Sequence, residues 1–168
     1  STRPGNTVSI SWFFPEMALP GYFAPKHGTP EENVRHNTDL ADTPGESRYI
    51  GTLRDAAAGH GMIVSFGFAE RDGDDVHNAV GVIDADGTWL GTRRENPVRL
   101  DSYDAITTTK TPIGGRSAVF ATSRGNVGVL CCFDGEFPDR VRTMRLQRAE
   151  ILLWSNCAPG STSTGPSS

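Results

Sequence analysis

The feature that most constrains the fold is the stretch 126–154, where a strand, a turn, a helix and a second strand follow one another. "NVGVLCC" (126–132) and "ILLW" (151–154) are apolar runs of strand length. Between them, Pro138 stands at a first helical position with Asp139 behind it, at the start of "PDRVRTMRLQRAE". Strands that alternate with helices in this way are typical of layered folds. We therefore expect a mixed α/β domain.

Apolar runs elsewhere in the chain predict further strands. A strand is expected near the end of "STRPGNTVSISWFFPE" and another in "MIVSFGFAE". Two hairpins are expected, one in "HNAVGVIDADGTWLGTRR" with its turn at 85–87, and one that pairs "SAVFAT" with "NVGVLCC" through a turn at 123–125.

Helix signals occur once more, in "SRYIGTLRDAAAGHG" (47–61), where Ser47 is a cap and a glycine ends the pattern. The stretch from Gly21 to Thr43 is rich in Pro, Gly, His and Asn, and we expect a long loop there with one turn of helix. We assign residues 1–156 to one domain and 157–168 to a Ser/Thr/Gly-rich tail with the composition of a disordered segment.

Charge and cysteine content exclude several classes of protein. The net charge of -4 argues against a nucleic-acid partner. The three cysteines show no disulfide framework, which favours a reducing compartment. The sequence has neither a leader peptide nor an apolar run long enough to cross a membrane, so a cytoplasmic location is expected.

The adjacent cysteines are distinguished by strand alternation. Val127, Val129 and Cys131 share one face of the expected strand, which makes Cys131 the packing residue, whereas Cys132 at the strand end points the other way. A helix amino terminus follows closely, and such a setting lowers a thiol pKa and stabilises an oxyanion. Cys132 is therefore the candidate nucleophile, although buried free cysteines are also common without a chemical role.

Glu16 is the candidate partner of this thiol. It follows bulky aromatic residues and a proline, a costly place for a charge unless the charge is paired or used. A carboxylate near a thiol can take its proton and later activate water. The alternative is a strand-end glutamate that faces solvent. The four histidines lack the spacing of metal ligands, so no metal site is predicted.

Three ordered segments resemble the nitrilase superfamily of carbon-nitrogen hydrolases. "FFPEMALPGY" is similar to the family's general-base segment, and "VGVLCCFDGEFPDRVRTMRLQRAEILL" is similar to its nucleophile segment. Between them, "GFAERDGDDVHNAVGVIDADGTWLGTRR" resembles the central stretch of the family, with its Glu, its Asn and a hairpin. The resemblance spans about Ile10 to Asn156.

Position by position, the resemblance implies roles for four residues. Glu16 matches the base, Cys132 the nucleophile, Glu70 a supporting acid, and the Phe133 N–H the donor to the oxyanion. It also implies a four-layer αββα sandwich that dimerises through helices, needs no metal or organic cofactor, and hydrolyses a small amide or nitrile through a cysteine thioester.

The sequence departs from the family pattern in three respects. Glu95 stands where the family has its catalytic lysine, and Arg148 stands where it usually has glycine. An anion at position 95 is expected to raise the pKa of both Cys132 and Glu16. The family pattern is also longer than this chain, which implies an incomplete sandwich. These departures keep open a second hypothesis, a catalytically impaired binding or assembly module; a redox-active thiol protein is a third.

Overall fold

Two facing β-sheets form the centre of the molecule in the computed structural model, which describes residues 11–21, 29–96 and 119–157. The first sheet has the order β1-β2-β3-β4, and the second has the order β5-β6-β7. The strands of the first sheet are β1 (Ser11–Phe13), β2 (Ile63–Asp72), β3 (Asp75–Ile83) and β4 (Trp89–Arg94). Those of the second are β5 (Val119–Thr122), β6 (Gly125–Cys131) and β7 (Ile151–Ser155).

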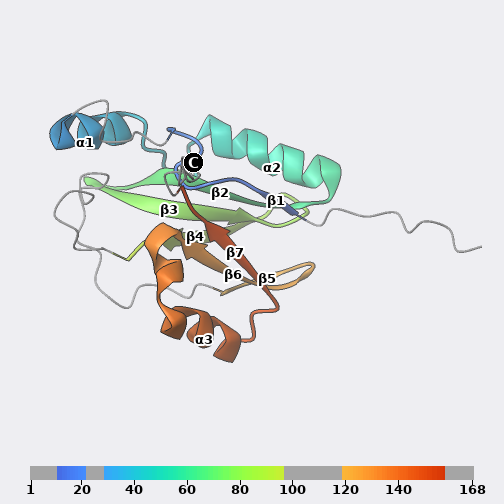
Figure 1. The fold of residues 1–168 in the computed structure, drawn as a ribbon. Helices are drawn as coiled ribbons and strands as arrows, with labels where there is room; N and C mark the ends of the chain where they lie inside the picture. Colours follow the sequence, from blue (N-terminus) through green and yellow to red (C-terminus); the bar gives the residue numbers. More distant parts are fainter. Residues whose placement is uncertain (1–10, 22–28, 97–118, 158–168) are drawn as a thin grey trace, which may run out of the picture.

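Helices lie on the outer sides of both sheets. Figure 1 shows α1 (Pro30–Asp39) and α2 (Arg48–His60) above the four-stranded sheet and α3 (Pro138–Leu146) below the three-stranded one. A short 3-10 helix, η3 (Cys132–Glu136), joins β6 to α3. The layers follow the order α, β, β, α, so the expected αββα sandwich is confirmed, in the incomplete form that the sequence predicted.

The core has one part on each face of the first sheet. Under α2, Ile50 and Ala57 pack on Phe66 and Phe68 of β2. Between the sheets lies a second cluster, contributed mainly by β3 and β6: Ile63, Val80, Val82, Val127, Val129 and Cys131. Because β2 and β3 are buried on both faces, they read in the sequence as nearly continuous apolar runs.

The two hairpins and α2 form where the sequence predicted them. The Ser47 side chain accepts a hydrogen bond from the Ile50 N–H at 3.3 Å, and Gly61 ends α2 with a left-handed φ of 62°. The prediction of a long loop over 21–43 was wrong, because α1 occupies most of its described part. Thr29 and Glu32 form a capping box around Pro30, and this polar start signal outweighs the missing apolar periodicity.

The end of α3 explains the unusual Arg148. The expected helix continued to Glu150, but α3 ends at Leu146 and Arg148 adopts a φ of 67°. The Ala149 N–H donates to the Met144 carbonyl at 3.0 Å and the Arg148 N–H to the Arg145 carbonyl at 3.0 Å. This is a Schellman motif, whose left-handed residue is normally glycine.

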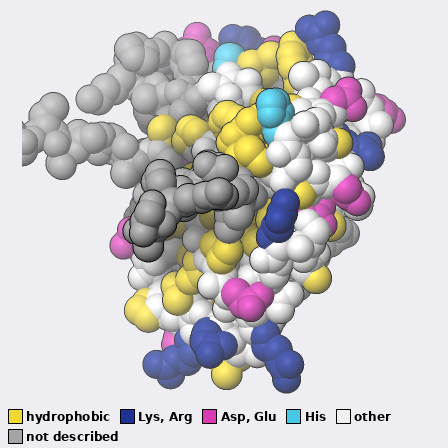
Figure 2. Space-filling view, turned by 90° about the vertical axis from the view of Figure 1, so that its right-hand side faces the viewer, with side chains coloured by type: hydrophobic (Ala, Val, Ile, Leu, Met, Phe, Trp, Pro, Cys, Tyr) yellow, Lys and Arg dark blue, Asp and Glu magenta, His cyan; other side chains and the backbone are white. Residues whose placement is uncertain are grey.

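Several large hydrophobic side chains reach the surface of the described part of the chain. They include Leu152 and Trp154 of β7, which are 42% and 40% exposed and lie on the last strand of their sheet. In the space-filling view, hydrophobic side chains reach the surface across the middle of one face, between charged side chains above and below (Figure 2). None of the helices in the described ranges is long and apolar enough to span a membrane.

Candidate active site

The candidate nucleophile lies in a sharp turn directly after β6. Cys132 is the first residue of η3 and has a φ of 40°, a left-handed conformation that is costly for a residue other than glycine. Trp154 on the neighbouring strand β7 donates its indole N–H to the Cys132 carbonyl at 2.7 Å. Its ring lies so close to Gly135 that a Cβ there would meet the ring at 2.3 Å. Thus β7 holds the nucleophile turn in place.

Glu16 lies in the turn after β1 and is 2% exposed. Its Oε1 accepts a hydrogen bond from Asn78 Nδ2 at 2.6 Å, and its Oε2 accepts one from the Cys157 N–H at 3.1 Å. A Cβ on Gly67 would lie 2.4 Å from the Met17 nitrogen, so only glycine lets this turn sit so close to β2. Burial and these two hydrogen bonds therefore fix the carboxylate.

β7 also contacts this turn, because Ser155 Oγ donates to the Phe14 carbonyl at 3.2 Å. Cys157, the first residue of the predicted tail, donates its backbone N–H to Glu16. The rest of the predicted tail, residues 158–168, lies outside the described residues. The segment from Trp154 to Cys157 thus contacts both the nucleophile turn and the base turn.

The structure brings the Glu16 carboxyl group and the Cys132 thiol close enough for each to shift the pKa of the other. Burial raises the pKa of Glu16 above its ordinary value. Burial and the Glu16 charge also raise the pKa of Cys132, and Glu95 adds to this shift. The expected raising of the Cys132 pKa by Glu95 is therefore confirmed, whereas the expected net lowering is wrong, because the Phe133 N–H lowers this pKa less than burial and the two carboxyl groups raise it. The resting thiol is neutral.

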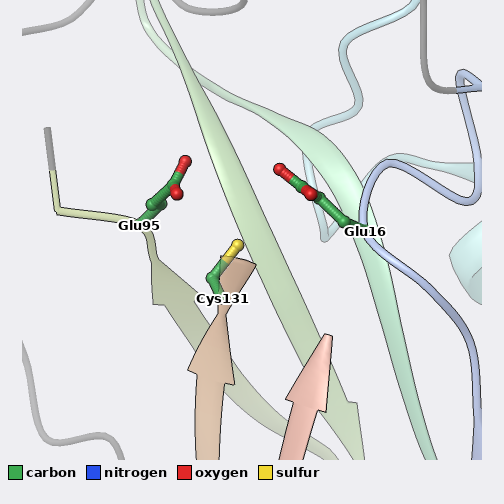
Figure 3. A group of neighbouring side chains, drawn as sticks. All are labelled: Glu16, Glu95 and Cys131. Atoms are coloured by element: carbon green, nitrogen blue, oxygen red, sulfur yellow. The ribbon is translucent and has the colours of Figure 1, made fainter. Parts of the chain in front are cut away.

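Cys131 is fully buried in the core between the sheets, as predicted for the packing cysteine. Its thiol does not point away from the site, however, because it donates to Asn78 Oδ1 at 3.6 Å. Strand alternation places Cys131 correctly with Val127 and Val129, but this face of β6 also reaches the site at the strand end. Figure 3 shows the Glu16 and Glu95 carboxyl groups facing each other across the Cys131 thiol.

Glu16, Glu95 and Cys131 can each offer one metal-binding atom, and these atoms lie within 4.8 Å of one another. They form the one such group among the described residues. Asn78 Nδ2 donates to both carboxyl groups, at 2.6 Å to Glu16 and 2.8 Å to Glu95, so an amide already bridges them. We therefore interpret the cluster in terms of proton transfer and hydrogen bonding.

Glu95 follows β4 directly and lies within the candidate site. Its Oε2 accepts from Asn78 Nδ2 at 2.8 Å, and its Oε1 accepts from the Phe133 N–H at 3.3 Å. Burial raises the pKa of Glu95 to about 8, and the Glu16 charge adds to this shift. The residue expected to bring a second negative charge into the site therefore holds a proton at neutral pH. Glu95 also accepts a hydrogen bond from the Phe133 N–H, the group that was predicted to bind the oxyanion.

The arginines before Glu95 are engaged elsewhere. Arg93 pairs with Asp134 at 2.8 Å, and Arg94 pairs with Glu70 at 2.5 Å and with Asp72 at 2.8 Å. Within the described ranges, no ion pair includes Glu16 or Glu95. Among the described residues, Glu70, the predicted supporting acid, is linked to the site through its ion pair with Arg94, the residue before Glu95.

Sequence reasoning assigned no role to Asn78 or Asp134. Asn78 links both carboxyl groups and the Cys131 thiol. Asp134 is 2% exposed and accepts hydrogen bonds from Arg93 and, at 2.7 Å, from Asn96. These two bonds fasten the nucleophile turn to the end of β4. Both residues fall inside the motifs that carried the family resemblance, which was the one signal that could have identified them.

The αββα sandwich is also the fold of a solved carbon-nitrogen hydrolase from Helicobacter pylori. The chain belongs to the carbon-nitrogen hydrolase family, whose model matches residues 12–168.

Among curated relatives, the chain is 32% identical over 140 residues to a citrullinase of Francisella tularensis, covering 83% of this chain and 47% of that protein. It is 33% identical over 94 residues to an N-carbamoylputrescine amidase of Solanum tuberosum, covering 56% and 31%. The chain thus spans about half or less of these relatives' length. A solved amidase from Nesterenkonia sp. shares the fold at 19% identity and a TM-score of 0.67, covering 90% of this chain and 53% of that one.

Proposed function

We propose that this chain carries the catalytic centre of a hydrolase that cleaves a carbon-nitrogen bond in a small amide through a cysteine thioester. Cys132 is the nucleophile, Glu16 moves the proton, and the Phe133 N–H binds the oxyanion. The observation that carries the proposal is that the Cys132 thiol lies close enough to the buried Glu16 carboxyl group for each to shift the pKa of the other, in a chain of this family.

Acylation begins from the neutral thiol. Glu16 takes the thiol proton while Cys132 Sγ forms a bond to the amide carbon, and the carbonyl π electrons move to the oxygen. The Phe133 N–H donates to this oxygen. When the tetrahedral intermediate collapses, the C–N bond breaks and Glu16 passes the proton to the leaving nitrogen. A thioester and ammonia or an amine result.

Deacylation uses the same two side chains. Glu16, again ionised, takes a proton from a water molecule while the water oxygen attacks the thioester carbon. The C–S bond then breaks and the proton returns from Glu16 to Cys132, which releases the acid. The raised pKa of Glu16 suits this double use, because a carboxyl group nearer neutrality both accepts and returns a proton readily.

An amide is favoured over a nitrile as the substrate. The relatives reported above are named as a citrullinase and as amidases. Nitrilases also occur among the relatives, including one of Pyrococcus abyssi that is 32% identical over 100 residues. Nitriles therefore belong in the substrate panel.

The test is a single-turnover reaction with simple amides, N-carbamoylputrescine, citrulline and a nitrile. Intact mass reports an acyl adduct and its later loss by hydrolysis, and an ammonia assay on the amides reports the acylation step. We expect an adduct that is lost in Cys132→Ala and strongly slowed in Glu16→Gln. The control is Glu46→Gln, which removes an exposed carboxylate far from the site chemistry. Absence of an adduct at every pH would overturn the proposal in favour of a binding or assembly role.

A further inference from the structure

Glu95 lies where the substrate oxygen has to bind. Its Oε1 accepts the Phe133 N–H at 3.3 Å, and this N–H is the proposed donor to the oxyanion. A substrate oxygen that takes over this hydrogen bond comes to lie beside the Glu95 carboxyl group. The inference below therefore rests on the proposed function.

Two oxygen atoms in contact attract each other only when a proton lies between them. An ionised Glu95 would repel the developing oxyanion, and partial burial of both groups would strengthen this repulsion relative to bulk water. A neutral carboxyl group, in contrast, can turn its O–H toward the oxyanion, as buried carboxylic acids do when their site keeps them protonated.

The surroundings of Glu95 favour the neutral form. The titratable groups that act on it and on its neighbours are all acidic: Glu16 from the turn after β1, Cys131 from β6, and Cys132 and Asp134 from η3. The guanidinium groups of Arg93 and Arg94 are paired with other carboxylates. Glu95 thus has no cationic partner among the described residues, and its pKa of about 8 agrees with this arrangement.

We infer that Glu95 is a catalytic residue that acts in its neutral form, donating its carboxyl O–H to the oxygen of the tetrahedral intermediate beside the Phe133 N–H. The Glu95 proton remains on Glu95 throughout. The proton released by the thiol travels separately, through Glu16 to the leaving nitrogen. The Asn78 amide, bonded to Glu95 Oε2, keeps the carboxyl group oriented while Oε1 faces the substrate. A hydrogen-bonding acid thus takes the place of the family's lysine cation.

The experiment is the pH dependence of acylation, measured as the single-turnover release of ammonia, in the wild-type chain and in two variants. Above pH 8 the wild-type rate should fall about tenfold per pH unit, because the protonated fraction of Glu95 falls in this way. Glu95→Gln keeps a donor that cannot ionise, so its rate should stay level over this range. Glu95→Met removes the donor and should lower the rate about 100- to 1,000-fold at every pH.

Two further measurements separate the possible outcomes. Alkylation of Cys132 by iodoacetamide displaces iodide without forming an oxyanion, so at pH 6 its rate should be similar in all three proteins. An infrared carboxylic-acid band present at pH 7 and missing in Glu95→Gln would identify the proton directly. Glu46→Gln serves as the matched control for both measurements.

An unchanged pH profile in Glu95→Gln, or full activity in Glu95→Met, would overturn the role of Glu95 while leaving the proposed function intact. No acylation in any of the three proteins, with normal alkylation of Cys132, would overturn the proposed function and this inference together.

Discussion

Trp154 donates its indole N–H to the backbone carbonyl of Cys132 at 2.7 Å. The bond joins β7 to the residue with the left-handed φ of 40°. A strained turn persists only where its surroundings hold it. Asp134 fastens this turn to the end of β4, and β7 adds one hydrogen bond and an aromatic ring packed on Gly135. The position of the nucleophile therefore depends on the strand that follows it along the chain.

Trp154→Phe tests this dependence. Phenylalanine keeps an aromatic ring against Gly135 but cannot donate to the Cys132 carbonyl, so the turn loses about 1 kcal/mol of support. We expect single-turnover acylation to slow about fivefold, with a similar slowing of Cys132 alkylation by iodoacetamide. Leu152→Ala alters the other exposed side chain of β7 and serves as the control. Equal alkylation rates in wild type and Trp154→Phe would show that the hydrogen bond does not position the thiol.

Gly67→Ala should displace the base. The added Cβ would lie 2.4 Å from the Met17 nitrogen and 2.5 Å from the Pro15 oxygen, both backbone atoms. The turn that carries Glu16 must then move away, so we expect acylation to be lost and the free energy of unfolding to fall. In Gly59→Ala nothing lies within 4 Å of the new Cβ, and this helical position should instead gain up to about 1 kcal/mol. Single-turnover acylation measures the displacement of the base, and urea denaturation measures the free energy of unfolding of both variants.

Arg148→Gly should stabilise the protein. Arg148 holds a φ of 67°, which costs a non-glycine residue about 1 kcal/mol, and glycine at this position of a Schellman motif removes the cost. Arg145→Gly places the same substitution inside α3, where it should destabilise by about 1 kcal/mol. Urea denaturation distinguishes the expected gain in stability from the expected loss. A loss of stability in Arg148→Gly would contradict the assignment of a Schellman motif to the end of α3.

The Glu95 carboxyl group should make the folded protein less stable as the pH rises. The unfolded chain releases this proton near 4.5, whereas the folded chain holds it to about 8. Between these values the folded state binds more protons, so the free energy of unfolding decreases as pH rises, by up to about 1.4 kcal/mol per unit. Glu95→Gln should show a shallower decrease in urea titrations from pH 5 to pH 8. Equal slopes in the two proteins would show that Glu95 is ionised at neutral pH in the folded chain.

Several turns and helix starts were predictable because their sequence signals are local. The hairpin turn at 85–87, the Ser47 cap and the Pro138 helix start each depend on a few neighbouring residues, and all three were found as predicted. The helix α1 was missed because its start signal is polar and its sequence lacks an apolar stripe. Its capping box was nevertheless present in the spacing of Thr29 and Glu32.

The site was only partly predictable because its energetics depend on long-range contacts. Glu16 and Cys132 were chosen from local patterns and the family resemblance, and the structure brings them together. Two opposite effects on the pKa of Cys132 were predicted, a lowering by the helix amino terminus and a raising by Glu95. The pKa is raised, because burial and two carboxyl groups outweigh the nearby N–H. Nothing local to Glu95 indicates that its pKa is raised. The shift follows from burial and from the opposing Glu16 carboxylate, both of which other parts of the chain supply.

The bond from the Cys157 N–H to Glu16 joins residues that are 141 positions apart. Contacts of such high sequence separation form late, since most of the loop-closure entropy has to be lost first. The base therefore reaches its final environment only when β7 has docked, and a partly folded chain has an accessible thiol without a positioned partner. The acylation of Cys132 by an amide then reports completed folding, whereas its simple alkylation does not.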